Sequence, residues 1–278
     1  MKQRAILIGV FFWCSLTVAS GWAGPFKGRV GCPHCVNDGS EVSQLLQQFD
    51  ALYAAFKPKE ALKPVLRVLE LEPNNLEALA KAARVNIELG DIITESETNW
   101  QEKRLKQYRI AEGYARKAVK ADPNNTWGHF YLAASLGKMA VHSSVSKQID
   151  LADEIRSAVE KAIASDPQNG FAYHVYGIWH RKIAEVGKAS RFLASTFLGR
   201  SVPKGNLNTS VEYFLKALAL NPTVVSHHLE LGKTYVALGK WDLARASLKS
   251  SLVHPIQFSN DAAHKKEAEQ LLRELKDR

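Results

Sequence analysis

Short motifs built around proline recur along this chain and set the points at which helices must end. They occupy residues 72–75, 122–125, 166–169, 221–223 and 254–255. Proline has no backbone N–H and its ring clashes with the preceding turn, so it cannot continue a helix. The Asp and Asn residues beside it supply a turn and a cap for the next helix. The pattern therefore predicts a series of helical segments with regular stops.

Positions at constant distances from these prolines hold mostly small or aliphatic residues. Counting back twelve, eight and five residues from the first four prolines gives Ala61, Val65 and Val68; Ala111, Ala115 and Ala118; Ile155, Val159 and Ala162; and Ser210, Phe214 and Ala217. Small residues are needed where two packed helices, about 8–10 Å apart, cross. After Pro222, Leu231, Gly232 and Tyr235 match the Leu-Gly-x-x-Tyr element of a tetratricopeptide first helix. We therefore predict an all-α, tetratricopeptide-like solenoid of helical hairpins over residues 41–278.

The distances between the prolines predict that most repeats are lengthened. Successive intervals are 50, 44, 55 and 33 residues, whereas a tetratricopeptide repeat takes about 34. The extra residues fall between the two helices of a hairpin, at 91–102, 142–148 and 183–208. Residues 261–275 have an amphipathic pattern. This pattern predicts a C-terminal helix that caps the last repeat, as the ends of solenoids require.

Residues 1–23 have the pattern of an export signal. Lys2 and Arg4 give a positive start, residues 5–18 are mostly apolar, and Gly21-Trp22-Ala23 is a small-x-small cleavage pattern. We therefore expect an extracytoplasmic protein, either periplasmic or secreted. The alternative is an uncleaved anchor in contact with a membrane, if the apolar run extends through Trp22. The basic bias of the remaining chain is mild and lacks arginine–aromatic clusters, so we expect no nucleic-acid partner.

Residues 24–40 contain a Cys-x-x-Cys motif at Cys32 and Cys35. Cys-Pro-His-Cys is an active sequence of oxidising thiol exchangers of the thioredoxin class, whose cysteines follow a strand. No alternating strand pattern occurs in this chain, so we expect a local disulfide and rank a thiol–disulfide oxidoreductase a distant third function. The chain also lacks a helical His-x-x-x-His pair and a glycine-rich phosphate loop. We therefore expect no metal and no cofactor.

One further motif, His174-x-x-Gly177-x-Trp179, is more specific than the repeat. It is followed by Ala184, Arg191, Ala194, Gly199 and Pro203, then Phe214-Leu215-Lys216-Ala217, Leu231-Gly232-Lys233-Thr234-Tyr235 and Ala263-His264-Lys265. With this pattern, residues 124–275 resemble the tetratricopeptide domain of the regulator of microtubule dynamics family, and the chain looks like a bacterial exported relative. Lys188 departs from the family, which commonly has tryptophan there.

The resemblance implies a binding protein. Family members in eukaryotes associate with microtubules or organelle membranes, and the repeat domain of some is credited with holding phospholipid. An exported bacterial protein would not meet tubulin, so we carry over the scaffold role and, as an alternative, lipid binding.

First helices of stacked repeats line a concave groove, and fixed offsets after each proline select the residues expected to face it. These residues are Arg84, Trp127, Phe130, Lys138, Phe171, His174, Ile178, Arg181, Lys182 and Lys233. Aromatic side chains at one level and basic ones at the next suit an acidic peptide or an anionic amphiphile. The competing interpretation is that Trp127 and His174 belong to the core and that the basic side chains simply face water. Residues 189–199 are expected either to cover this groove as a lid or to pack outside it.

We therefore predict that the protein is not an enzyme. The leading hypothesis is a scaffold that binds a protein or peptide partner in the groove. The alternative is a carrier or sensor of a phospholipid or another anionic amphiphile.

Overall fold

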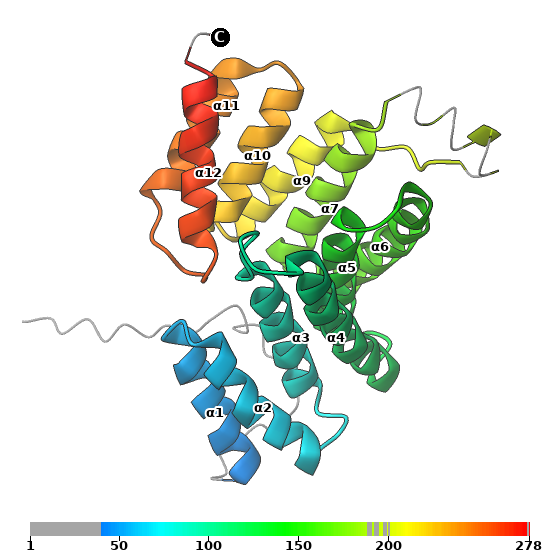
Figure 1. The fold of residues 1–278 in the computed structure, drawn as a ribbon, viewed down its shortest axis with the longest axis vertical. Coiled ribbons are helices and arrows are strands. Elements are labelled where there is room, and N and C mark those ends of the chain that lie inside the picture. The colour runs from blue at the N-terminus through cyan, green and yellow to red at the C-terminus, as the bar shows by residue number, and fades with distance from the viewer. Residues whose placement is uncertain (1–39, 188–190, 192–194, 197–198, 200, 277) are drawn as a thin grey trace, which may run out of the picture. The chain divides into compact units, whose positions relative to one another are not determined.

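The computed structural model describes residues 40–278 except 188–190, 192–194, 197–198, 200 and 277 (Figure 1). The chain divides into two units, Met1–Asp38 and Gly39–Arg278, and the description below concerns the second. The predicted export signal and the Cys32–Cys35 disulfide lie outside the described residues, as does most of the 189–199 segment.

The described residues form helices and no strand, which confirms the all-α prediction. The helices are α1 (Glu41–Ala54), α2 (Pro58–Leu71), α3 (Leu76–Asp91), α4 (Trp100–Ala121), α5 (Thr126–Val141), α6 (Val145–Ser165), α7 (Gly170–Ala184), α9 (Leu207–Leu220), α10 (Val225–Ala237), α11 (Trp241–Val253) and α12 (Asp261–Glu274).

These helices pack as consecutive hairpins. Contacts join α1 with α2, α3 with α4, α5 with α6, α7 with α9 and α10 with α11, as Figure 1 shows. The first helices of successive hairpins also touch, in the order α3, α5, α7 and α10. This is the predicted tetratricopeptide-like solenoid. We call the surface formed by these four first helices the inner face.

The proline motifs act as predicted at the helix ends. The side chains of Asn75, Asn125 and Asn169 cap α3, α5 and α7. Each accepts a hydrogen bond from the backbone N–H three residues later, at distances of 2.9, 2.6 and 3.2 Å. Each cap satisfies one of the N–H groups that a helix start leaves without a partner. The motif therefore ends one helix and starts the next.

The small residues allow the helices of a hairpin to approach closely. A methyl group added at Gly177 would lie 2.9 Å from the Phe214 ring, and one added at Gly232 would lie 2.8 Å from Leu248. The residues selected by counting back from the prolines are almost all fully buried, including Ala61, Val65, Val68, Ala111, Ala115, Ala118, Val159, Ala162, Ser210, Phe214 and Ala217. The fixed distances in the sequence therefore mark the hairpin interfaces.

The extra residues of the long repeats lie within the hairpins. In the first long repeat α3 ends at Asp91 and α4, 22 residues long, begins at Trp100. In the second the extra residues mainly lengthen α6 to 21 residues. In the third, Arg191 donates hydrogen bonds to the backbone carbonyls of Val186 and Pro203, at 3.1 and 2.9 Å. Arg191 therefore ties together the two ends of the segment between α7 and α9.

Helix α12 closes the last hairpin, as predicted. Ala268 and Leu275 of this helix pack against Leu229, Ala244 and Leu248 of α10 and α11. Among the described helices none is both long and apolar enough to cross a bilayer.

Candidate functional site on the inner face

Aromatic side chains from neighbouring first helices meet on the inner face. The Phe130 ring of α5 lies 6.2 Å from the Phe171 ring of α7, and Phe171 lies 5.4 Å from the His227 ring of α10. Phe130 and Phe171 remain half-buried. Trp127, also predicted for the groove, packs against Phe130 and Tyr131 and is only 7% exposed. Trp127 therefore belongs to the packed wall behind the inner face.

His174 and His227 form a buried pair next to these rings. Their rings stack with centroids 4.7 Å apart, and their Nδ1 atoms lie 3.0 Å apart. Burial lowers the pKa of His174 to about 4 and that of His227 well below its usual value. Both rings are therefore neutral near pH 7, and one Nδ1–H donates to the other Nδ1. His174 also meets the Phe214 ring edge-on, so it serves packing as much as the surface.

At the next level the basic residues meet carboxylates. Arg181 pairs with Glu230, whose other oxygen accepts a hydrogen bond from Lys233 at 2.9 Å. Lys233 also lies 2.8 Å from Glu267 of α12. Burial alone would raise the pKa of Glu230, but the charges of Arg181 and Lys233 outweigh it and lower that pKa to about 2. The cluster is therefore ionised and internally neutralised.

A second charged cluster lies on α3. The Arg84 guanidinium covers the Tyr53 ring at 3.9 Å, and its Nε donates to the Tyr53 hydroxyl at 2.8 Å. Glu88, one turn further along, accepts a hydrogen bond from that same hydroxyl. Burial raises the pKa of Glu88 to about 8. Lys138 of α5 donates to both oxygens of Asp91 at 2.8 and 2.7 Å.

The predicted groove residues thus divide into groups. Arg84, Phe130, Phe171, His174, Arg181 and Lys233 line or border the inner face, and Lys138 pairs with Asp91 at the end of α3. Ile178 is half-buried. Lys182, in contrast, has a side chain 60% exposed and pairs with Glu185. Whether these residues bind a ligand stays a prediction.

The predicted groove residues did not include the acidic residues that pair with the basic residues of the inner face. Glu88 lies fifteen residues after Pro73, the same offset that selected Lys138 and Lys182, so a signal for it existed. Glu230 and His227 of α10 lie eight and five residues after Pro222, at offsets that were not selected. Phe258 lies outside the repeats, so no repeat offset could have selected it.

Residues 256–260, between α11 and α12, lie against the inner face, and we call them the inner-face segment. The Phe258 ring meets the Phe171 ring edge-on at 5.9 Å, and the Arg84 guanidinium lies 5.5 Å from the Phe258 ring centre. The Ser259 hydroxyl lies 3.0 Å from a Glu88 oxygen. The chain thus contacts its own predicted groove.

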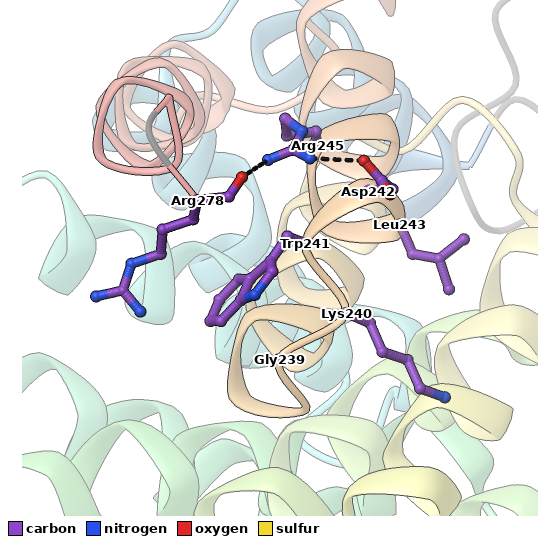
Figure 2. A pocket seen from close by; sticks show the side chains of 7 residues that line it. All are labelled: Gly239, Lys240, Trp241, Asp242, Leu243, Arg245 and Arg278. Carbon is purple, nitrogen blue, oxygen red and sulfur yellow. Dashed lines mark hydrogen bonds and ion pairs between the residues drawn. The ribbon is translucent and has the colours of Figure 1, made fainter.

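Surface pockets among the described residues include one that borders the predicted groove and one that does not. One has a volume of about 480 Å³ and is lined by residues that include Trp100, Arg104, Lys138, His142 and His264. The other, of about 470 Å³, is formed by the start of α11 and the last residue of the chain (Figure 2). There Arg245 donates to the Asp242 carboxylate and to the Arg278 carbonyl. This second pocket shares no residue with the predicted groove.

Comparison with known proteins extends the resemblance to nearly all of the described residues. Residues 45–276 match the family described as regulator of microtubule dynamics protein 1-3. Regulator of microtubule dynamics protein 1 of Bos taurus is 28% identical over 240 residues, covering 86% of this chain and 73% of its own. The Homo sapiens protein of that name is 30% identical over 195 residues, covering 70% and 60%.

A solved structure agrees on the fold. A thermophilic TPR protein of Thermus thermophilus has a TM-score of 0.60 and 18% identity, covering 84% of this chain and 99% of its own. The chain therefore belongs to the regulator of microtubule dynamics protein 1-3 family.

Proposed function

We propose that this protein is a non-catalytic scaffold that binds a protein partner through its inner face. The family and the tetratricopeptide-like fold support a protein-interaction role. The observation that carries the proposal is that the inner face already holds a stretch of the chain's own polypeptide, the inner-face segment. A surface that accommodates one short stretch of polypeptide offers the same side chains and polar groups to another.

The charged groups around Arg181 suit a binding role for this part of the inner face. Arg181 and Lys233 are balanced by Glu230 and Glu267, and the histidines His174 and His227 are held neutral. Groups of fixed charge orient a bound partner, and Glu88, whose pKa burial raises to about 8, is a group on this face that changes its charge near neutral pH.

A carrier of a phospholipid or another anionic amphiphile is the second candidate. The pocket of about 480 Å³ supports it, because Trp100 and His142 offer apolar walls beside Arg104 and Lys138. Its volume falls within the range of about 300–1,000 Å³ that small-molecule sites occupy. We rank it second because Lys138 is already paired with Asp91. Oxidoreductase activity at Cys32 and Cys35 stays a distant third proposal.

The proposal places the scaffold outside the cytoplasm. This location rests on the export pattern of residues 1–23. Membrane contact follows only if that segment is retained as an anchor.

Site-specific photocrosslinking tests the scaffold proposal. A benzophenone amino acid replaces Phe130 on the inner face or Leu243, which is 47% exposed on α11. In the native host, the Phe130 position should give a protein adduct and the Leu243 position should not. Protein adducts from Leu243 alone would contradict inner-face binding. A lipid-sized mass on the intact Phe130 variant would favour the carrier instead.

A further inference from the structure

Side chains of the inner-face segment contact α3 as well as the start of α10, the earliest and the latest of the four first helices of the inner face. The Gln257 side chain donates to the Thr223 hydroxyl beside α10 at 2.8 Å. Two residues later, Ser259 reaches Glu88 on α3, 171 positions away in the sequence. Between them, the Phe258 ring lies against Phe171 of α7. Consecutive side chains of the segment thus contact three first helices or their caps.

Phe258 is the anchor of this arrangement. Its ring meets the Phe171 ring edge-on, a geometry that aromatic pairs prefer. The Arg84 guanidinium, held over Tyr53, also lies 5.5 Å from the Phe258 ring centre. We call Phe171 and Arg84 the aromatic seat. The Glu88 carboxyl beside it accepts a hydrogen bond from the residue that follows the aromatic side chain.

The segment is held by a few contacts and can leave without unfolding the cap. Its backbone is ordered by Asp261, whose Oδ2 accepts hydrogen bonds from the N–H groups of Gln257 and Phe258 at 2.8 and 2.9 Å. Helix α12 has its own core with α10 and α11, through Ala268 and Leu275. Phe258 is only half-buried and Ile256 is 49% exposed. Release of the segment therefore exposes the aromatic seat while α12 stays packed.

The geometry points to the inner-face segment as a resident occupant of the aromatic seat, and to a peptide with an aromatic side chain as the external partner that replaces it. This inference rests on the proposed scaffold function, and it names the partner's chemistry. The side chain after the aromatic residue of the partner carries a hydrogen-bond donor for Glu88. The wild-type protein binds such a peptide weakly, because the attached segment competes at high effective concentration.

A peptide titration tests this inference. The probe is a synthetic peptide of residues 253–262 with 4-fluorophenylalanine at the position of Phe258, followed by ¹⁹F NMR. The protein variants are wild type, Phe258→Ala and the double variant Phe258→Ala with Phe171→Ala. We expect Phe258→Ala to bind the peptide about tenfold more tightly than the wild type, and the double variant to lose that gain.

Ile256→Ala is the matched control, because it shortens an exposed side chain of the same segment. It should bind the peptide as the wild type does. Circular dichroism and thermal melting establish that each variant is folded. Equal affinity of Phe258→Ala and the wild type, or no binding to folded Phe258→Ala, would overturn the inference.

The outcome separates this inference from the scaffold proposal. A protein adduct at Phe130 together with no peptide binding rejects the aromatic seat and leaves the scaffold intact. Tight peptide binding by Phe258→Ala without a protein adduct supports the inner-face segment as the resident occupant of the aromatic seat and rejects an external protein partner.

Discussion

Arg181 and Lys182 are neighbours in α7, yet their side chains lie in opposite environments. The Arg181 side chain is 4% exposed and pairs with Glu230 on the inner face. The Lys182 side chain is 60% exposed and meets Glu185 on its own helix. On the outer helices, Arg116 links Glu112 and Glu154 in the same exposed way. Ion pairs between the same types of residue therefore differ in effect. Buried pairs fix which helices meet, and exposed pairs add little to the stability of the fold.

Removing one charge from each environment should give the largest contrast. Arg181→Ala leaves Glu230 buried without its main partner, so we expect a loss of about 3–5 kcal/mol in the free energy of unfolding. Lys182→Ala should change it by no more than about 0.5 kcal/mol. Urea unfolding of both variants measures the difference. Similar losses for the two variants would show that burial does not separate the two faces.

Replacing glycine by alanine should destabilise the protein at a hairpin interface and stabilise it on an exposed helix face. Gly177→Ala places a methyl group 2.9 Å from the Phe214 ring, and we expect it to cost about 1–3 kcal/mol. Gly113→Ala, on the exposed side of α4, meets nothing within 4 Å. It should stabilise the protein by about 0.5–1 kcal/mol, because alanine favours a helix. Thermal melts give both values, and a neutral Gly177→Ala would contradict the proposed close approach of α7 and α9.

The pH dependence of stability should report the burial of Glu88. The folded-state pKa of Glu88 is raised from its usual value to about 8. The folded state therefore holds a proton that the unfolded state has released, and this contribution to stability is lost as the pH rises towards 8. Glu88→Gln does not titrate, so it should gain about 1.5 kcal/mol on the wild type between pH 6.5 and 8.

Urea unfolding at a series of pH values measures this difference. Histidines with lowered pKa values, such as His174, act in both proteins and cancel in the comparison. A constant difference between wild type and Glu88→Gln would mean that Glu88 is ionised throughout the range.

Much of the fold was predictable because each signal is local. Proline stops, asparagine caps and small residues at fixed offsets act within one helix or one hairpin, and residues such as Asn125 and Gly177 lie where those rules place them. The site was predicted only in part. Phe130 and Phe171 lie next to each other on the inner face, but Lys182 points outward although its offset matches that of Lys138.

The family motif was likewise recognisable in the sequence, whereas the contacts that its residues make became visible only in the structure. His174, Gly177 and Trp179 identified the family, but their contacts are structural. The Trp179 indole donates to the Ala152 carbonyl at 2.8 Å, and Gly177 makes room for Phe214. The motif therefore contributes to how α6, α7 and α9 pack.

The sequence by itself determined an all-α chain of capped hairpins, since helix stops, caps and crossing residues depend on near neighbours. Only the tertiary structure decided that Glu230 neutralises Arg181 and that Phe258 lies on Phe171. These contacts join residues far apart in the sequence, and they follow from how the stacked hairpins bring α3, α7, α10 and the segment before α12 together. No periodic sequence pattern encodes how these elements come together, because their positions depend on the combined geometry of all the helix interfaces that lie between them.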